Sequence, residues 1–420
     1  MLPYGRQAID QDDIEAVVRT LRSDFLTCGP EVEAFEHEFA KFVGAKHAVA
    51  VCNATAALHL AMKILGIGPG QRVVTSPNTF LASANAAAYV GAIPDFSDIE
   101  TNFHGLDPVT LEKNWKADTK AVVAVDYAGA PCNMPEIARI ARERGAFVIE
   151  DACHGIGGGF YNGGKLWRLG GHPWADITTF SFHPVKTMTT GEGGILVTEN
   201  DEWAANARLL RAHGITRNSS EFVGLIDKDD HAPSCSSQLS ECGPWYYEMQ
   251  QLGYNFRITD PQCALGRSQL AKLPDFISRR QTIASRYNDA FANIGWLQVP
   301  VLATHHQSAA SSDIFSFGLS DLSLHLYTVQ IDFARLRKTR TEVMQELRDQ
   351  GVGSQVLYIP VYLQPWYRQT FGYASGKCPN AEAFYTRALS LPLYPSMTDQ
   401  DVQRVIYSVR ALGGSPVAAK

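Results

Sequence analysis

The sequence predicts an α/β protein whose mostly parallel sheet is covered by helices on both faces, followed by a smaller C-terminal α+β domain. Three observations support this fold class. The chain has 420 residues, which favours two domains over one. Between residues 47 and 198, short and almost uniformly apolar segments alternate with segments of helical periodicity. After residue 253 helices predominate and strands are few, as expected for a second domain of mixed composition.

Each element follows from its local pattern. Two helices joined by a turn at residues 27–30 are expected between residues 9 and 43, where large apolar side chains recur at helical spacing. Strands of the main sheet are expected at residues 47–52, 72–76, 121–126, 147–149, 177–182 and 195–198, with helices at 54–65, 79–90 and 134–144. For the C-terminal domain we expect helices at residues 260–273, 275–291, 340–350 and after 399, with a strand near 324–331.

The predicted domains are residues 1–250 and residues 251–420. A polar insertion without periodicity, at about residues 217–245, lies near the boundary. Within it, Cys235 and Cys242 are close enough in sequence for a local disulfide to be conceivable. Several of the other cysteines stand in apolar or small-residue runs, which is typical of buried free thiols.

Composition excludes several classes of function. The formal net charge of −6 is spread along the chain, and no basic block marks a nucleic-acid or membrane-surface partner. No apolar run approaches the roughly 18 residues of a membrane span, and the N-terminus lacks the pattern of a signal peptide. The cysteines show neither a C-x-x-C pair nor zinc-type spacing, so no metal is expected. A cytoplasmic enzyme with reduced thiols is the resulting expectation.

Residues 176–194 contain a single lysine, Lys186. It lies between an apolar run that includes serine and histidine and a turn rich in threonine and glycine. Phe180, Phe182 and Val185 would remove water from its amine, and a lysine kept partly neutral can condense with an aldehyde. Taken alone, a lysine in a loop is usually a solvated surface charge, and it is the setting of Lys186 that favours a catalytic role.

Asp151 is the expected partner of this lysine. It follows the apolar run at residues 146–149 and therefore stands at the carboxyl end of a strand. A carboxylate that keeps a pyridine nitrogen protonated, together with a lysine that holds an aldehyde, suits pyridoxal phosphate. Alone, Asp151 is also compatible with a helix cap or an ion-pair partner.

Further groups are expected at the same edge of the sheet, since ligands of such sheets bind at the carboxyl ends of strands. Residues 53–57 follow a strand and open a helix, which makes either an anion site or an ordinary N-cap. Ser181 offers a second hydroxyl to a phosphate or bonds within its own strand end. His154 either donates to the phenolic oxygen of a pyridine ring or is structural. Phe80 either stacks on a flat cofactor or belongs to the core.

Six segments, in this order along nearly the whole chain, resemble those of the DegT-type nucleotide-sugar aminotransferases. They are PNTF at residues 77–80, EDACH at 150–154, TFSFHPVK at 179–186, TGEGG at 190–194, RAHG at 211–214 and GYNFR at 253–257. The resemblance implies fold type I with a seven-stranded sheet, a homodimer, and pyridoxal phosphate held by Lys186. It also implies Asp151 at the pyridine nitrogen, Phe80 on the ring face, Thr55, Ala56 and Ser181 at the phosphate, and Asn255 of the partner subunit at the same phosphate.

Within this family, four further segments are most similar to one branch. They are PYGRQ at residues 3–7, DYAG at 126–129, GPWYYE at 243–248 and HLY at 325–327. That branch comprises the C4 aminotransferases of the pseudaminic acid pathway. These enzymes use L-glutamate to aminate the 4-keto group of a UDP-linked 2-acetamido-2,6-dideoxy sugar.

Other functions remain open at this point. Cys28, Cys52, Ala54 and the long insertion depart from the family's usual pattern, which leaves a different UDP- or dTDP-keto sugar, aminated at C3 or C4, as an alternative. A sugar dehydratase on the same fold would carry histidine in place of Lys186. A cofactor-binding regulator without turnover is the alternative from a different class. Residues expected to contact the nucleotide or sugar, or to be structural, are His213, Arg257, His325 and Tyr358.

Overall fold

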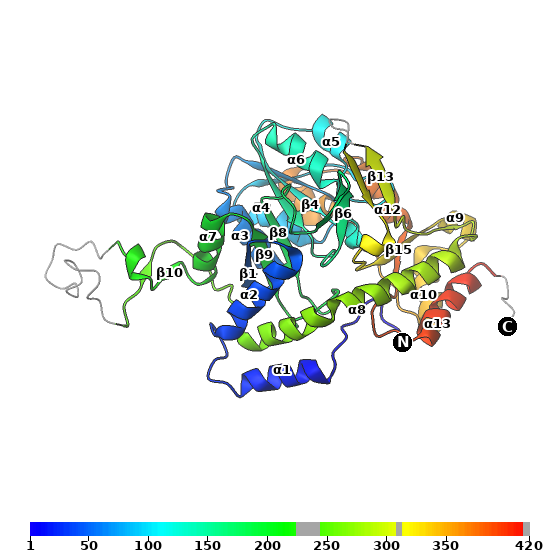
Figure 1. Cartoon of the computed structure of the whole chain (residues 1–420). Coiled ribbons are helices and arrows are strands. Elements are labelled where there is room, and N and C mark those ends of the chain that lie inside the picture. The colour runs from blue at the N-terminus through cyan, green and yellow to red at the C-terminus, as the bar shows by residue number, and fades with distance from the viewer. Residues whose placement is uncertain (224–243, 308–312, 415–420) are drawn as a thin grey trace.

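The computed structural model describes residues 1–223, 244–307 and 313–414. A seven-stranded sheet lies at its centre, in the order β1-β9-β8-β5-β4-β2-β3 (Figure 1). The strands are β1 (His47–Val51), β2 (Arg72–Thr75), β3 (Ile93–Phe96), β4 (Thr119–Val125), β5 (Phe147–Asp151), β8 (Ile177–Ser181) and β9 (Gly194–Thr198). Only β9 runs against the others, pairing antiparallel with β1 and β8. The mostly parallel α/β sheet predicted from the sequence is confirmed.

The two faces of the sheet enter different apolar clusters, because successive side chains of a strand point to opposite sides. Val148 faces a cluster formed with α2 (Pro30–Val43), α6 (Met134–Arg142) and α8 (Asp260–Phe291). Ile149 faces the other cluster, formed with α3 (Ala54–Ile64), α4 (Leu81–Tyr89) and α7 (Asp201–Arg211). Asp151, two residues on, therefore lies on the side of α3 and α4.

Two smaller sheets accompany the main one. A three-stranded sheet joins β12 (Leu297–Gln298), β15 (Tyr327–Ile331) and β16 (Ala388–Leu391). A four-stranded sheet joins β13 (Thr304–Gln307) and β14 (Ile314–Phe317) to a hairpin from the N-terminal half, β6 (Gly159–Asn162) and β7 (Lys165–Arg168). This hairpin, β3, β13 and β14 were not predicted from the sequence. The remaining helices are α1 (Gln11–Leu21), α5 (Pro108–Lys113), α9 (Phe333–Leu336), α10 (Arg340–Asp349), α11 (Pro365–Phe371), α12 (Pro379–Arg387) and α13 (Asp399–Ala411).

Helix α8 corrects one prediction. Two helices were expected on either side of Pro274, but a single helix of 32 residues runs through it, beneath the sheet and alongside α1 (Figure 1). Proline removes one backbone hydrogen bond and costs about 3 kcal/mol inside a helix. Buried apolar side chains both before Pro274, such as Leu273, and after it, such as Tyr287, belong to the same core cluster and keep the helix continuous.

The polar insertion is described only at its ends. There, β10 (Ile215–Thr216) pairs with β11 (Glu248–Met249). Residues 224–243, and with them Cys235 and Cys242, lie outside the described part of the chain. The six described cysteines are free thiols, and three of them, Cys132, Cys263 and Cys378, are buried as expected. In the described segments no helix combines the length and apolarity needed to cross a membrane.

Candidate active site

The polar groups expected to act together meet at one edge of the main sheet. Asn53 and Phe80 follow β1 and β2, whereas Asp151 and Ser181 are the last residues of β5 and β8. These four strands are parallel to one another, so their carboxyl ends lie at the same edge.

The Asp151 carboxylate is buried and held by two hydrogen bonds. The Ser83 hydroxyl donates to Oδ2 at 2.6 Å, and the Cys153 amide donates to Oδ1 at 3.2 Å. Because Ser83 gives its own proton to Asp151, the Thr79 hydroxyl, 2.7 Å from Ser83 Oγ, must donate to Ser83. Ser83 was not predicted from the sequence. The one sequence feature that could have indicated it is its spacing of one helical turn from Thr79, within a helix that was correctly expected.

Lys186 lies in the loop after β8 and is only partly exposed. Its amide donates to the His183 carbonyl at 2.9 Å, and the Thr189 hydroxyl donates to the Phe182 carbonyl at 2.8 Å, so the loop is anchored on both sides of the lysine. Burial lowers the pKa of Lys186, while Cys153 and Asp151 act in the opposite direction. The amine therefore has a neutral form within easier reach than a solvated lysine has.

Two buried histidines, His154 and His325, form a group with the partly buried Tyr358 beside this pair. The two imidazole rings are 4.5 Å apart between centroids, and the Tyr358 hydroxyl lies 3.3 Å from His154 Nε2. Burial and the positive charge of Lys186 hold the pKa of both histidines well below the usual range. Phe80 is 57% exposed, with its ring 6.3 Å from that of Tyr358. An exposed aromatic face and two neutral imidazoles thus border the Lys186 loop.

The expected anion site lies at the start of α3. Its first N–H groups have no intrahelical acceptor, and one of them, that of Ala56, donates to the Asn53 side chain at 2.9 Å. The neighbouring Thr55 supplies a further amide and a hydroxyl. Ser181 is joined to this region through Gly194, its partner in β9, since a Cβ on Gly194 would lie 2.4 Å from the Ala54 nitrogen. Only glycine permits this approach of β9 to the helix.

His213, Asn255 and Arg257 lie in a separate group. The His213 amide donates to the Tyr254 carbonyl at 2.8 Å, and Asn255 pairs with Ala212 as an isolated bridge. His213 and Asn255 are exposed. Among the described residues, no hydrogen bond or ring contact joins this group to Lys186 within one subunit.

The residues at the sheet edge fit pyridoxal phosphate. They offer an amine, a buried carboxylate, an aromatic face and a helix N-terminus. In addition, the buried Thr179 hydroxyl has no hydrogen-bond partner among the described residues. Thr179 pairs in register with Asp151 on the adjacent parallel strand, so both side chains point to the same face of the sheet. An unpartnered hydroxyl there is consistent with a polar ligand beside Asp151.

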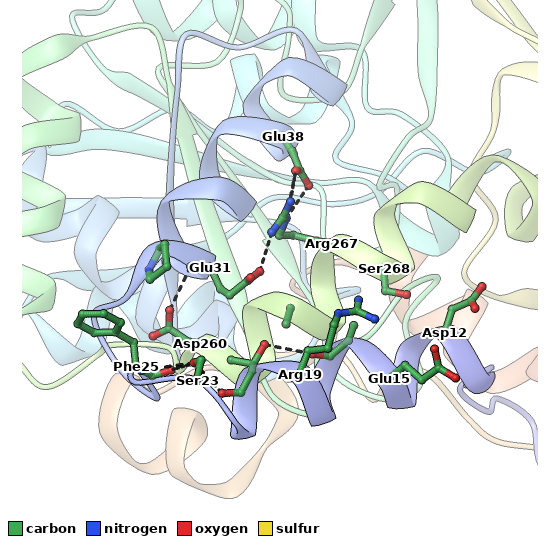
Figure 2. Close-up of a pocket in the computed structure, with 14 residues that line it drawn as sticks. Asp12, Glu15, Arg19, Ser23, Phe25, Glu31, Glu38, Asp260, Arg267 and Ser268 are labelled. Atoms are coloured by element: carbon green, nitrogen blue, oxygen red, sulfur yellow. Dashed lines mark hydrogen bonds and ion pairs between the residues drawn. The ribbon is translucent and has the colours of Figure 1, made fainter.

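A groove of about 640 Å³ between α1, α2 and α8 contains none of the expected site residues (Figure 2). Three of its charged side chains form ion pairs with one another, and a fourth accepts backbone hydrogen bonds. Arg267 binds Glu31 and Glu38 at 2.7 and 2.8 Å, and Asp260 accepts from the amides of Gly29 and Glu31. These contacts attach α8 to α2.

Comparison with known proteins identifies the family. Residues 7–410 match the model of the DegT/DnrJ/EryC1/StrS aminotransferase family, and the chain belongs to this family. It is 42% identical over 410 residues to the spore coat polysaccharide biosynthesis protein SpsC of Bacillus subtilis, covering 97% of this chain and 96% of SpsC. The resemblance stated from the sequence motifs is confirmed.

Solved structures agree with this assignment. The aminotransferase PseC of Helicobacter pylori, involved in the biosynthesis of pseudoaminic acid, is 28% identical with a TM-score of 0.81, over 98% of this chain and 99% of PseC. The putative sugar aminotransferase Spr1654 of Streptococcus pneumoniae, in its PLP form, is 26% identical with a TM-score of 0.82, over 98% of both chains. The aminotransferase fold expected from the sequence is confirmed.

The lowered pKa of Lys186 predicts a specific pH dependence of stability in the cofactor-free protein. Between that pKa and the ordinary value of about 10.4, the unfolded chain binds more protons at Lys186 than the folded one does. The free energy of unfolding of the parent should therefore rise, relative to that of Lys186→Met, as the pH approaches the ordinary lysine pKa of about 10.4 from below. Denaturant titrations across this range measure it, with Lys120→Met as an exposed-lysine control. Parallel curves for the parent and Lys186→Met would contradict it.

Proposed function

We propose that this chain is a pyridoxal-phosphate-dependent sugar aminotransferase. In the proposed reaction it transfers the amino group of L-glutamate to the C4 keto group of a UDP-linked 2-acetamido-2,6-dideoxy-4-hexulose. The observation that carries the proposal is the placement of the Lys186 amine beside the hydrogen-bonded Asp151 carboxylate in a full-length member of the family. A cofactor-binding regulator without turnover would hold the aldehyde with the same amine, so glutamate-dependent amination is the assay that separates it from the enzyme.

Bound pyridoxal phosphate would supply an aldehyde that accepts amino groups and a pyridinium ring that takes up electron density. Asp151, oriented by Ser83 and the Cys153 amide, would hold the proton on the ring nitrogen. Lys186 would hold the aldehyde carbon and, once its amine is released, would carry the proton from Cα of glutamate. The same amine would serve the amino donor and the keto sugar in turn, which predicts ping-pong kinetics.

The remaining edge residues would orient the ring and the phosphate. Phe80 presents an exposed face for stacking, and His154 lies beside the Lys186 loop to donate to the phenolic oxygen. At the other end, the first amides of α3, the Thr55 hydroxyl and Ser181 would bind the phosphate. Since the Ala56 amide already donates to Asn53, Ala56 would contact the phosphate only by sharing that N–H.

We also propose a homodimer in which Asn255 of the partner subunit completes the phosphate site. The directions of the side chains on either side of Asn255 support this proposal. Tyr254 and Phe256 both pack on His59 of α3, with ring centroids at 4.8 and 5.8 Å. In an extended segment the side chain between them points the opposite way, away from its own subunit.

The identity of the sugar substrate is the more specific part of the proposed function. The likeness to PseC favours the 4-keto sugar of the pseudaminic acid pathway, whereas the higher identity to SpsC favours another nucleotide sugar of polysaccharide synthesis. Glutamate-dependent amination of a panel of UDP- and dTDP-linked 3- and 4-keto sugars separates these possibilities. Amination of the UDP-4-keto substrate at the highest kcat/KM supports the proposal, and preference for another member of the panel selects the alternative.

Replacing Asp151 tests the role of the ring proton. In Asp151→Asn the amide cannot hold a positive charge on the ring nitrogen, so kcat should fall by about 10²–10³-fold while the fold is retained. Steady-state kinetics and circular dichroism measure the two effects. Asp201→Asn, which changes an exposed carboxylate, is the control and should keep the parent rate. Near-parent turnover of Asp151→Asn would refute the assignment.

Mixed dimers test whether two subunits build each site. Lys186→Ala and Asn255→Ala subunits should each be impaired alone, because every site lacks one group. After unfolding and refolding an equimolar mixture, half of the dimers are mixed and each contains one intact site. Roughly a quarter of the parent activity should then return. Activity that stays at the average of the two separate variants would show that Asn255 acts within its own subunit or not at all.

A further inference from the structure

The turn after β4 contacts both histidines beside Lys186 and the residue that precedes Tyr358. It is attached next to Asp151, since the Asp126 amide donates to the Asp151 carbonyl at 3.2 Å. The Asp126 carboxylate closes the turn by accepting from the Cys132 amide at 2.9 Å. Ala128, in the middle, has a left-handed backbone with φ of 60°, which is uncommon for a residue with a side chain.

The backbone of Ala128 binds both histidines. Its amide donates to His154 Nδ1 at 3.2 Å, and its carbonyl accepts from the His325 amide at 2.9 Å. The next residue, Gly129, lies so close that a Cβ would be 2.1 Å from the Ser323 carbonyl oxygen and 2.9 Å from that of His154. The loop that carries His325 is therefore pressed against this turn.

The hydrogen bond from the Ala128 amide determines which ring nitrogen of His154 carries the proton. A ring nitrogen that accepts a hydrogen bond has no proton, so a neutral His154 must carry its proton on Nε2. The Tyr358 hydroxyl lies 3.3 Å from that nitrogen. Burial keeps the pKa of His154 low and so keeps the ring neutral.

Tyr127 fixes the position of Tyr358. Its hydroxyl donates to the carbonyl of Leu357 at 2.6 Å, immediately before Tyr358, and is also 3.3 Å from the Thr328 hydroxyl. Tyr127 is 1% exposed, so no water competes for these bonds. Three consecutive residues thus hold the Tyr358 segment, both histidines and the Ser323 loop.

We propose that the Tyr127–Gly129 turn is the positioning element of the site: it fixes His154 as an Nε2–H hydrogen-bond donor, and Tyr127 holds the Tyr358 hydroxyl beside that donor. The donor cannot accept a proton at Nε2, so it gives a constant hydrogen bond and takes no part in proton transfer. The role of this hydrogen bond in catalysis rests on the proposed function. The position of the proton on His154 does not depend on that function.

The proton is located by NMR of the cofactor-free protein with ¹⁵N-labelled histidine, using His154→Gln to assign the resonances. We expect His154 to show a protonated Nε2 and an unprotonated Nδ1, unchanged from about pH 6 to about pH 9. A proton on Nδ1, or an imidazolium that forms as the pH falls through this range, would overturn the proposal. This measurement needs no turnover, so it separates a wrong tautomer from a wrong function.

Tyr127→Phe tests the positioning role. It removes the hydroxyl but keeps the ring, and Tyr287→Phe is the matched control, since it removes another buried hydroxyl that donates to the Pro392 carbonyl at 3.0 Å. We expect Tyr127→Phe and Tyr358→Phe to speed exchange of the His154 Nε2 proton equally, by roughly tenfold, and the double variant to add nothing. Additive effects, or an equal effect of Tyr287→Phe, would show that Tyr127 is merely structural.

Discussion

The arrangement of the site depends on keeping the Asp151 carboxylate buried at the end of β5. An isolated buried charge is strongly unfavourable, so such a group needs hydrogen bonds or an opposite charge. Here Ser83 and the Cys153 amide supply the hydrogen bonds, and Lys186 supplies the positive charge. The Cys153 amide is local to Asp151, whereas Ser83 and Lys186 come from other elements and reach it only if the strand order and the faces of the sheet are correct.

The same proximity sets the properties of Lys186. Burial disfavours its charged form and lowers its pKa, and the carboxylate partly opposes that effect, so the nucleophilic amine forms more easily than in a solvated lysine. The pKa values of the neighbouring histidines are lowered as well, because their own burial and the charge on Lys186 keep the imidazole rings neutral. Neighbouring groups are thus assigned different tasks: a charged anchor, a titratable amine, and neutral hydrogen-bond donors.

Much of this was predictable from local patterns. Short apolar strands alternating with helices are enough to place Asn53, Asp151 and Ser181 at one edge, because parallel strands end together. What escaped prediction depends on contacts distant in sequence. Ser83 meets Asp151 across 68 residues, and β6 pairs with β14 across more than 150 residues. Likewise, Pro274 was read as a helix end, since only tertiary packing reveals that the helix continues. The sequence marked residues 126–129 only as part of a family resemblance. The contacts of the Tyr127–Gly129 turn escaped prediction because those of Ala128 and Gly129 are made by the backbone, and the Tyr127 hydroxyl bonds to Leu357, which is 230 residues away.

The central claim is that Lys186 holds pyridoxal phosphate and gives it up to an amino donor. The most direct test is the visible absorption spectrum of the protein reconstituted with pyridoxal phosphate, before and after addition of L-glutamate, with Lys186→Ala alongside. We predict an absorption band that bleaches with glutamate in the parent and is altered in the variant. A spectrum that shows no such band after reconstitution, or one that is identical in Lys186→Ala, would contradict the account.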